Sequence, residues 1–385
     1  MLHLIETLGS GGAERLLHTN LKHFDTNRVA SEVVTVFSNG DYWKKPIEEL
    51  GVRVSSLECR GYKDILAGVR RLRKYIAENR IDLIHTHLFA ANVIGRIAGR
   101  LSGVPVISSI HNPEYEPEAY EGASSAIRRK IGIARLVDKL TARFGCTRMI
   151  AVSNYVKETT ITRLGYPLSK IDVIYNPVHL SEADEWEGRK AVRESLGLPD
   201  SAVFLLHVGR LSPQKGFIDA VRAMQRIIAE MPHAHLVSVG SQTDADYKSK
   251  VMNEIDSLGL ATSVYLAGER RDVTRLLRSC DIFLFPSHFE GLGIALAEAM
   301  AVGCACVASD IRPLTEFVTN EVNGVLVKPK KSELLADAVT GLLRDSAKRD
   351  PLGLAARETA LDLFQPNHAA EKLVNIYFDT VKADG

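Results

Sequence analysis

Two glutamates in the sequence FPSHFEGLGIALAEAM have the spacing and the surroundings to do chemistry. Glu290 lies just before a predicted helix, where Gly291 and Gly293 leave backbone amides open to a ligand. Glu298 falls within the otherwise apolar helical run 294–301, where a buried carboxylate is costly unless it is paired or hydrogen-bonded. The two carboxylates could therefore hold a hydroxyl-rich ligand. On its own, however, the segment favours a structural interpretation, in which Glu290 caps the helix and Glu298 is a surface charge of the helix.

A second candidate group consists of two cations in the sequence HVGRLSPQKGF. Arg210 and Lys215 fall in a loop directly after a predicted strand, with Gly209 and Gly216 beside them. Two cations in a glycine-containing loop suit a diphosphate, which an arginine can bind through two parallel hydrogen bonds. The alternative is a pair of surface charges, and it is weakened because both residues follow the carboxyl end of a strand.

The first loop of the chain, LGSGGAE, is also rich in glycine. It follows the first predicted strand and opens the first helix, so Gly11 and Gly12 would let a ligand approach a positive helix start. The loop has neither the G-x-G-x-x-G fingerprint of dinucleotide-binding proteins nor the lysine of a P-loop. Ligand binding and a tight turn without a ligand both remain open for it.

Histidines and a pair of aspartates complete the candidate residues. His111 ends the predicted strand 106–110, where an imidazole could exchange a hydrogen bond with a ligand hydroxyl, although a lone histidine is more often structural. His85 and His87 have the spacing of a metal pair, but no nearby carboxylate or cysteine completes a site. We therefore expect one of the two to line a cleft and the other to be packed. The D-x-D sequence at 244–246 could hold a metal, but a solvated turn is the better interpretation.

These residues must be positioned by alternating strands and helices. Two successive β-α series predict two doubly wound parallel-sheet domains, with a boundary near 175–178 and ligands at the carboxyl ends of strands in an interdomain cleft. The predicted strands are 2–5, 32–37, 83–85, 106–110, 149–152 and 173–174 in the first series, and 203–208, 236–239, 264–266, 282–285, 305–308 and 324–327 in the second.

Composition is that of a globular protein. The 385 residues are 45% hydrophobic and 25% charged, with a formal net charge of +1, and this length favours two large domains. The first residues lack the features of a secretory signal, and no apolar stretch is long enough to cross a bilayer. The five scattered cysteines are expected to be reduced thiols, which predicts a cytoplasmic protein.

Charge is distributed unevenly along the chain. Residues 1–180 hold 25 Lys and Arg against 18 Asp and Glu, whereas residues 181–385 hold 23 against 29. A basic cluster between Arg128 and Arg143 alternates with apolar residues and predicts an amphipathic helix that could rest on an anionic membrane surface. An ordinary helix with its apolar face in the core is the alternative, and this segment alone favours it. Nucleic acid is not an expected partner, because the basic clusters lack interleaved aromatic residues.

Taken in order, the motifs resemble those of the retaining glycosyltransferases of family four, which have the GT-B architecture. The resemblance spans nearly the whole chain and rests on GSGGAE, HNP after a strand, GRLSPQKG, AGERRDV and CDIFLFPSHFEGLGIALAEAMAVG. The spacing of Glu290 and Glu298 matches the E-x(7)-E pair of that family. The resemblance implies a GT-B fold with two Rossmann-like domains facing across a cleft. These are 1–178 on the acceptor side and 179–365 for the nucleotide sugar, and the C-terminal helix 366–385 packs back on the first.

The resemblance also implies a role for each candidate residue. Glu290 would hold hydroxyls of the donor sugar and Glu298 the ribose, while Arg210 and Lys215 neutralise the diphosphate leaving group without a metal. His111 would lie beside the anomeric carbon, so His111 and Glu290 are the expected catalytic residues, with Glu290 not acting as a nucleophile. The remaining expected donor-binding residues are Gly11, Gly12, Gly291, Leu292 and Gly293.

The activity implied is retaining, metal-independent transfer of a hexosyl group from a nucleoside-diphosphate sugar. Uridine diphosphate sugars are expected first and guanosine diphosphate mannose next, and no cofactor is expected. The acceptor would be a glycan or a lipid-linked glycan of a cell-surface polysaccharide or glycolipid, reached by a peripheral protein on the inner face of the cytoplasmic membrane. The alternatives are a sugar-nucleotide epimerase of the same fold and a non-catalytic sugar-nucleotide-binding partner subunit.

Overall fold

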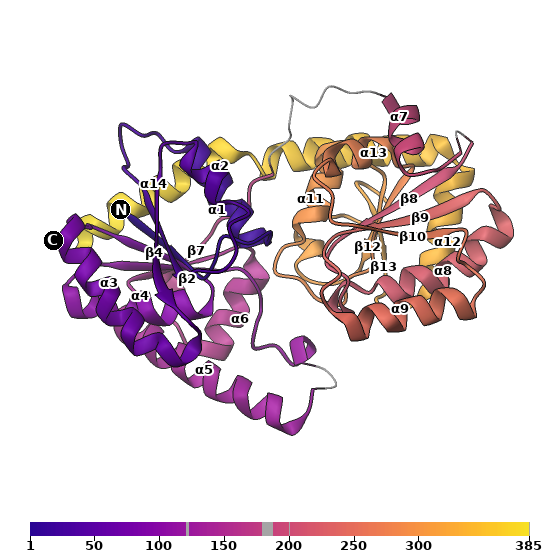
Figure 1. The fold of residues 1–385 in the computed structure, drawn as a ribbon. Helices are drawn as coiled ribbons and strands as arrows, with labels where there is room; N and C mark the ends of the chain where they lie inside the picture. Colours follow the sequence, from indigo (N-terminus) through magenta and orange to yellow (C-terminus); the bar gives the residue numbers. More distant parts are fainter. Residues whose placement is uncertain (121–122, 179–187, 200, 385) are drawn as a thin grey trace. The chain divides into compact units, whose positions relative to one another are not determined.

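The chain forms two units that each contain one parallel sheet. The computed structural model describes residues 1–120, 123–178, 188–199 and 201–384 (Figure 1). Unit 1 comprises Met1–Pro177 and Gln365–Gly385, and unit 2 comprises Val178–Phe364. These limits differ by one residue from the boundaries expected from the sequence.

In unit 1 the described residues form a seven-stranded sheet in the order β3-β2-β1-β4-β5-β6-β7, with parallel pairing throughout. The strands are β1 (Leu2–Ile5), β2 (Glu32–Phe37), β3 (Arg53–Cys59), β4 (Ile84–His87), β5 (Val106–Ile110), β6 (Arg148–Ala151) and β7 (Ile171–Val173). The helices are α1 (Gly12–His23), α2 (Lys44–Glu48), α3 (Ile65–Asn79), α4 (Phe89–Ser102), α5 (Ser125–Gly145), α6 (Asn154–Leu164) and α14 (Pro366–Asp384). Strand β3 was not among the predicted strands, because it is an edge strand in which only Leu57 and Cys59 are buried.

Each face of this sheet has its own apolar core. On one face, Leu2 and Leu4 of β1 pack with residues of α3 and α4 such as Leu72 and Ile94. On the other face, Ile5 belongs to a cluster that includes residues of α1 and α14. Because successive side chains of a strand point to opposite faces, His3 lies on the same face of β1 as Ile5.

In unit 2 the described residues form a six-stranded parallel sheet in the order β10-β9-β8-β11-β12-β13. Its strands are β8 (Val203–Val208), β9 (Ala234–Val239), β10 (Val264–Gly268), β11 (Ile282–Phe285), β12 (Cys306–Ser309) and β13 (Val325–Val327). Its helices are α7 (Gly188–Ser195), α8 (Phe217–Glu230), α9 (Ala245–Ser257), α10 (Val273–Ser279), α11 (Ile294–Ala301), α12 (Ser332–Arg344) and α13 (Ser346–Leu363). The predicted α/β class, with two doubly wound sheets, is confirmed.

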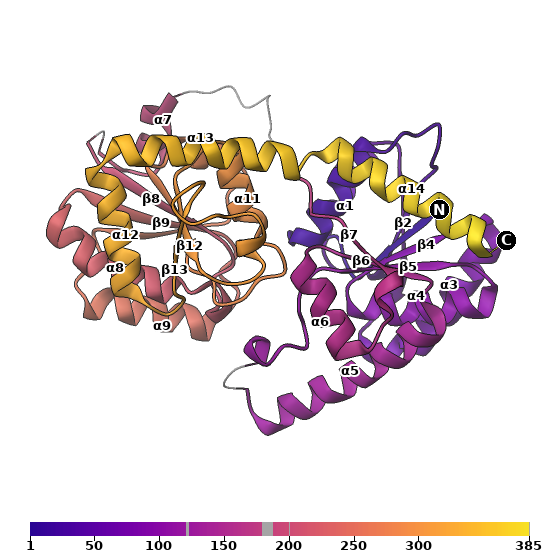
Figure 2. The same ribbon diagram turned by 180° about the vertical axis from the view of Figure 1, so that it is seen from behind.

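The last helix returns to the first unit, as the resemblance implied. Helix α14 contributes Leu373, Val374 and Tyr377 to the core cluster that also holds Ile5 and Leu17 (Figure 2). The C-terminal segment therefore covers one face of the first sheet, and unit 1 is built from both ends of the chain.

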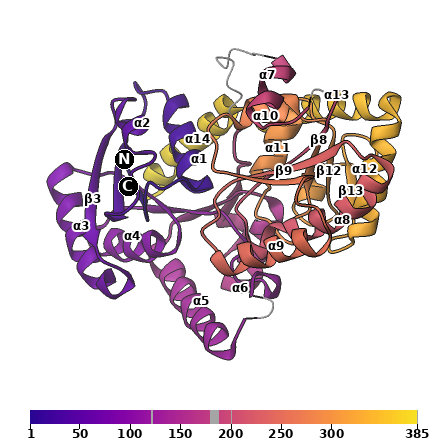
Figure 3. The same cartoon turned by 45° about the vertical axis from the view of Figure 1, so that its right-hand side comes forward.

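Ser124 is the N-cap of helix α5, and its hydroxyl accepts a hydrogen bond from the Ile127 amide. Only Asp138 and Ala142 of this helix are buried. Ile133 and Leu136 are 57% and 55% exposed, so the alternative that places the apolar face of α5 in the core is wrong for these residues. Figures 2 and 3 show the first half of α5 extending beyond the sheet of unit 1.

A buried ion pair joins helix α5 to helix α4. Arg96 of α4 is fully buried and pairs with Asp138, which also accepts a hydrogen bond from the hydroxyl of Tyr115 at 2.9 Å. Among the described residues, no helix has both the length and the apolar character needed to span a membrane.

Candidate active site

The loops that follow β8 and β11 meet because these strands are neighbours in the sheet of unit 2. Gly216 has a φ of +63°, and a Cβ atom placed on it would lie 2.0 Å from the carbonyl oxygen of Pro286. The amide of His288 donates to the carbonyl oxygen of Gln214 at 2.8 Å, and the side-chain amide of Gln214 donates to the carbonyl of Phe289 at 3.0 Å. Backbone contacts therefore fix the two loops to each other.

These loops bring Lys215 and Glu290 together. The Lys215 ammonium lies 2.6 Å from Oε1 of Glu290, and the two side chains are 16% and 6% exposed. The ammonium also lies 5.5 Å from the centre of the Phe285 ring, within the range of a cation–π interaction. Lys215 is therefore not an isolated surface charge, and the interpretation of Lys215 as one is wrong.

The start of α11 carries the remaining candidates of the glutamate motif. Gly291 and the buried Leu292 lead into Gly293, which occupies the N-cap position with a φ of +93° and makes no side-chain cap hydrogen bond. Glu290 is thus not the helix cap, and Glu298 is 7% exposed rather than a surface charge. The first amides of a helix have no intrahelical acceptor, so this helix start can bind an anion.

Arg210 is the exposed member of the group. It follows Gly209 in the loop after β8, and it makes no ion pair with any residue in the part of the chain that the structure describes. This loop packs closely against Gly240, which follows β9. Gly240 has a φ of +143°, and a Cβ atom there would lie 2.1 Å from the Gly209 carbonyl oxygen. Arg210 is accordingly a free guanidinium on a firmly held backbone.

Two histidines near this group were not singled out from the sequence. His207 of β8 is fully buried, with Nδ1 at 3.1 Å from the hydroxyl of Ser238. Burial, and next the charge of Lys215, lower the pKa of His207 to about 3. His288 lies 2.6 Å from the carboxylate of Asp219, which ties the loop after β11 to α8. For His207, the available signal in the sequence was a histidine on a predicted strand that is followed by a glycine-containing loop.

In unit 1, His111 directly follows β5 at the carboxyl end of the sheet. Its Nε2 atom lies 3.3 Å from Nδ1 of His87, and the two rings are stacked with centres 5.5 Å apart. Burial lowers the pKa of His111 to about 4, so its imidazole is neutral at pH 7. His111 lines a pocket with Asn92, Glu114 and Arg163, and can donate or accept a hydrogen bond there.

Glu114 is a further candidate that sequence reasoning missed. The residue as a whole is exposed, yet its carboxyl group is desolvated, and this effect, followed by the charge of Asp138, raises its pKa to about 7. Because Glu114 lines the same pocket as His111, it is a further candidate for contact with a ligand there. Its position three residues after His111, at the end of a strand, was the available signal.

The glycine loop after β1 is closed by its own carboxylate. Gly11 is the N-cap of α1, and a Cβ atom on it would lie 2.3 Å from a carboxylate oxygen of the buried Glu14. The hydroxyl of Thr7 donates to the other carboxylate oxygen at 3.2 Å. Gly11 is therefore required by the turn itself, and donor binding by Gly11 and Gly12 stays a prediction.

The other candidate metal motifs have different outcomes. His85 and His87 are each 1% exposed, so the prediction that one of them lines a cleft is wrong; α14 covers the face of β4 on which they lie. Asp244 accepts a hydrogen bond from the Tyr247 amide at 3.0 Å as the N-cap of α9, and Asp246 lies in the first turn of that helix, so the D-x-D sequence opens a helix rather than forming the expected turn.

The sequence matches models of two families that divide the chain between them. Residues 10–182 match the model described as Glycosyltransferase Family 4, and residues 188–359 match the model described as Glycosyl transferases group 1. An uncharacterized glycosyltransferase of Methanocaldococcus jannaschii is 31% identical over 306 residues, which are 78% of this chain and 75% of the relative. The UDP-Gal:alpha-D-GlcNAc-diphosphoundecaprenol alpha-1,3-galactosyltransferase of Escherichia coli is 28% identical over 319 residues, 80% of this chain and 78% of that enzyme.

Solved structures share the fold over nearly the whole chain. The crystal structure of Anabaena HepE in complex with UDP-glucose has a TM-score of 0.84 at 24% identity, covering 98% of this chain and 99% of that one. The sucrose-phosphate synthase of Thermosynechococcus elongatus has a TM-score of 0.82 at 20% identity, covering 99% of both chains. With its two matched families, its relatives and its two parallel-sheet units, the chain belongs to the family 4 glycosyltransferases of the GT-B fold.

Proposed function

We propose that this glycosyltransferase moves a hexosyl group, with retention, from a nucleoside-diphosphate sugar to a glycan or lipid-linked acceptor in cell-surface polysaccharide or glycolipid synthesis. The observation that carries the proposal is the Lys215–Glu290 pair beside the start of α11, with Arg210 free on the adjoining loop. A UDP-sugar is the favoured donor and GDP-mannose the next. The Escherichia coli relative is named for a UDP-galactose donor, and Anabaena HepE was crystallised with UDP-glucose.

Departure of a nucleoside diphosphate concentrates negative charge on the leaving group. Arg210 can bind it through two parallel hydrogen bonds, and the Lys215 ammonium adds a second positive charge. The amides that open α11 supply hydrogen-bond donors and the positive end of the helix dipole. These groups provide the stabilisation that a divalent metal gives elsewhere, so we propose that no metal is required for transfer.

The two glutamates hold hydroxyl groups in this scheme. Once the diphosphate binds the Lys215 ammonium, the carboxylate of Glu290 can accept hydrogen bonds from hydroxyls of the donor sugar. The carboxylate of Glu298 accepts hydrogen bonds from the ribose hydroxyls. The acceptor hydroxyl attacks the anomeric carbon on the same face from which the nucleoside diphosphate leaves. The diphosphate takes the proton of that hydroxyl. His111, neutral at pH 7, bonds the transferred sugar near its anomeric carbon, and its role is positional and electrostatic.

The acceptor is proposed to lie at a membrane surface. The exposed residues of α5 include Arg128 and Arg129 and several apolar side chains, among them Ile133 and Phe144. Such a surface combines attraction to anionic lipid with shallow insertion of apolar groups. A peripheral enzyme on the inner face of the cytoplasmic membrane would meet both its nucleotide-sugar donor and a lipid-linked acceptor.

A thermal-shift panel tests the donor part of the proposal. The purified protein is heated with UDP, GDP, UDP-glucose, UDP-galactose and GDP-mannose, each with and without a chelator. We expect one nucleotide and its sugars to raise the melting temperature equally in both conditions, and Lys215→Met to lose most of that shift. Stabilisation that requires a divalent metal, or none by any sugar nucleotide, would contradict the model.

A further inference from the structure

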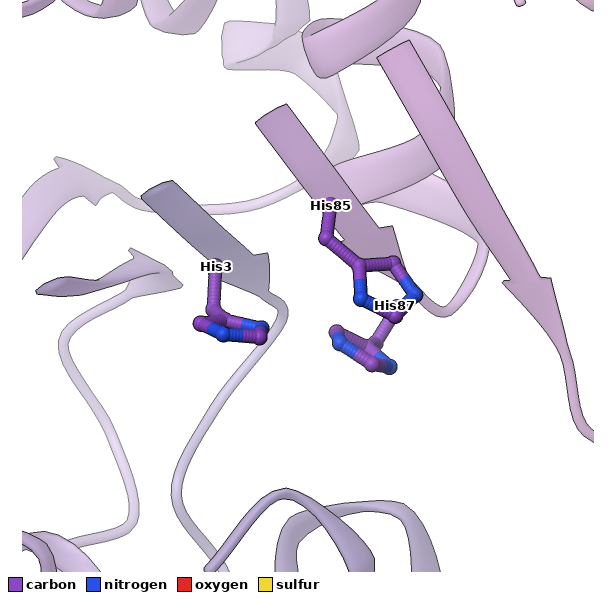
Figure 4. A group of neighbouring side chains, drawn as sticks. All are labelled: His3, His85 and His87. Atoms are coloured by element: carbon purple, nitrogen blue, oxygen red, sulfur yellow. The ribbon is translucent and has the colours of Figure 1, made fainter. Parts of the chain in front are cut away.

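Three histidines project from the same face of two neighbouring strands in unit 1. His3 of β1 is the register partner of His85 in β4, and His87 follows two residues later on the same face of β4. Figure 4 shows the three imidazoles on one side of these strands. One nitrogen from each ring can be chosen so that all three atoms lie within 4.8 Å of one another. The fold thus assembles a group of three nitrogen ligands from residues far apart in the sequence.

Burial keeps these imidazoles neutral. Each residue is 1% exposed, and desolvation, together with the neighbouring histidines, lowers the pKa of all three well below 6.5. A neutral imidazole keeps a lone pair on one ring nitrogen, which is the form that binds metal ions.

Several of the nitrogen atoms have no partner within the protein. Both ring nitrogens of His3 and Nε2 of His87 are buried without a hydrogen bond among the residues that the structure describes. Buried polar atoms without a partner are rare in folded proteins, because each has lost its hydration without replacement. Three such atoms in one small group therefore point to an occupant that is not part of the chain.

We propose that His3, His85 and His87 bind one divalent transition-metal ion, for which Zn²⁺ is the natural probe. Three histidine nitrogens without a carboxylate favour zinc, copper or nickel over magnesium and calcium. Zinc–nitrogen bonds of about 2.0–2.1 Å in a tetrahedral site bring the nitrogens to about 3.3 Å from one another, so the rings must turn inward on binding. The fourth position is left for water.

The partners of His85 supply the outer layer of such a site. Its Nδ1 lies 2.8 Å from the hydroxyl of Tyr377 in α14, and its Nε2 lies 2.8 Å from the hydroxyl of Ser109. Metal binding exchanges one of these contacts and retains the other, which orients the ring as outer partners of metal-binding histidines do. The ion would join β1 and β4 to each other and, through Tyr377, steady the covering helix α14.

The site also reaches His111 by way of His87. With the metal on Nε2 of His87, the proton of that ring is placed on Nδ1, which then donates to Nε2 of His111. The metal is nevertheless distinct from the proposed donor site, whose cations and glutamates belong to unit 2. Its presence or absence can be measured without any sugar nucleotide, so failure here leaves the proposed function untouched.

Cobalt substitution provides the test. The full chain, prepared without a polyhistidine tag and stripped with a chelator, is titrated with Co²⁺ and in parallel reconstituted with Zn²⁺ and dialysed. We expect visible absorption of a tetrahedral cobalt centre that saturates at one ion per chain, and one zinc ion retained. His3→Gln and His87→Gln should each weaken cobalt binding at least tenfold, whereas the control His368→Gln, an exposed histidine of α14, should not.

The proposal is overturned by a wild-type protein that shows no saturable visible band and retains no zinc. It is equally overturned if the band persists unchanged in His3→Gln and His87→Gln, because the metal would then lie elsewhere. The wild-type titration decides the first point even if a variant fails to fold. Far-ultraviolet circular dichroism of each variant establishes that a lost band reflects lost ligands.

Discussion

The Lys215 ammonium lies 2.6 Å from a carboxylate oxygen of Glu290, although 75 residues of sequence separate them. The cation proposed for the diphosphate is therefore neutralised by the carboxylate proposed for the sugar. A diphosphate that approaches Lys215 must displace Glu290, and the displaced carboxylate then becomes available to sugar hydroxyls. Binding of the leaving group and preparation of the sugar site would be one event.

This exchange predicts opposite effects of two substitutions on nucleotide binding. Glu290→Gln removes the competitor for Lys215, so UDP should bind several-fold more tightly while transfer falls. Lys215→Met removes the cation, so UDP binding should weaken at least tenfold and kcat/KM should fall by about 10²–10³, as for loss of one group that stabilises a developing anion. Isothermal titration calorimetry with UDP and a transfer assay measure the two quantities.

A second lysine of the same unit provides the control for Lys215→Met. Lys348 lies 3.3 Å from Glu321 in an exposed pair, so Lys348→Met makes the same chemical change away from the site and should alter neither quantity. If Glu290→Gln weakens UDP binding as much as Lys215→Met does, the carboxylate supports the loop rather than competing with the diphosphate.

Gly216 and Gly259 form a natural pair for testing how the two loops are held. Their φ angles are +63° and +65°, but a Cβ atom on Gly216 would lie 2.0 Å from the Pro286 carbonyl oxygen, while one on Gly259 meets nothing within 4 Å. Gly259→Ala should therefore cost about 1–2 kcal/mol, the price of a left-handed conformation alone, and spare activity. Gly216→Ala should cost more and abolish most transfer; equal losses in urea melts would show that the loops can separate.

The sequence predicts the elements of the site better than its contacts. The strands and helices can be predicted because each depends on the local periodicity of apolar residues. Their alternation places Arg210, Lys215 and His111 at the carboxyl ends of strands. The pairing of Lys215 with Glu290 depends instead on the register of two loops that no local pattern encodes. An edge strand such as β3, with few buried residues, also leaves no apolar pattern to detect.

The histidine group shows the same limit. His85 and His87 are recognisable as a pair because they lie two residues apart, but no carboxylate or cysteine near them in the sequence completes a metal site. The third member, His3, comes from β1, which becomes the neighbour of β4 only through the strand order of the sheet. Tyr377, the outer partner of His85, arrives from the last helix of the chain.

Glu298 and His111 should separate binding from catalysis. Glu298→Gln removes the proposed acceptor for the ribose hydroxyls and should raise the dissociation constant of UDP by about tenfold, a loss typical of a hydrogen bond to a charged group. His111→Ala should leave UDP binding unchanged and lower kcat by about 10²–10³, the range for loss of one group that stabilises charge in the transition state. Equal loss of UDP binding in both variants would contradict the assigned roles.

His207 should make the stability of unit 2 sensitive to acid. Because burial lowers its pKa from 6.5 to about 3, the unfolded chain binds a proton that the folded protein refuses between these values. Stability therefore rises with pH across that window, and this residue alone should cost about 2 kcal/mol between pH 7 and pH 5. The variant His207→Gln lacks this ionisable group. Between pH 7 and pH 5, urea unfolding should therefore show that the variant loses about 2 kcal/mol less stability than the wild type.

The exposed histidine His233, in the same unit, is the matched control for this measurement. His233→Gln should lose as much stability as the wild type between pH 7 and pH 5. A His207→Gln variant with the same pH dependence as the wild type would mean that the imidazole is protonated in the folded protein.

Helix α5 should bind anionic vesicles through its exposed face. Arg128 and Arg129 are exposed on this helix, which also carries exposed apolar side chains, so Arg128→Glu/Arg129→Glu should reduce cosedimentation with phosphatidylglycerol vesicles at least tenfold. Ile133→Ser should weaken binding even in low salt, because insertion of apolar surface contributes independently of charge.

Helix α3 supplies the control of equal charge change. Arg70 and Arg73 are exposed there, and Arg70→Glu/Arg73→Glu alters the net charge of the protein as much as the α5 double variant does. If attraction to the vesicle were a property of overall charge, both double variants would lose binding equally. If α5 is the docking surface, only its variant should detach, and it should also transfer sugar to a water-soluble acceptor at an undiminished rate, because the donor-binding residues are untouched.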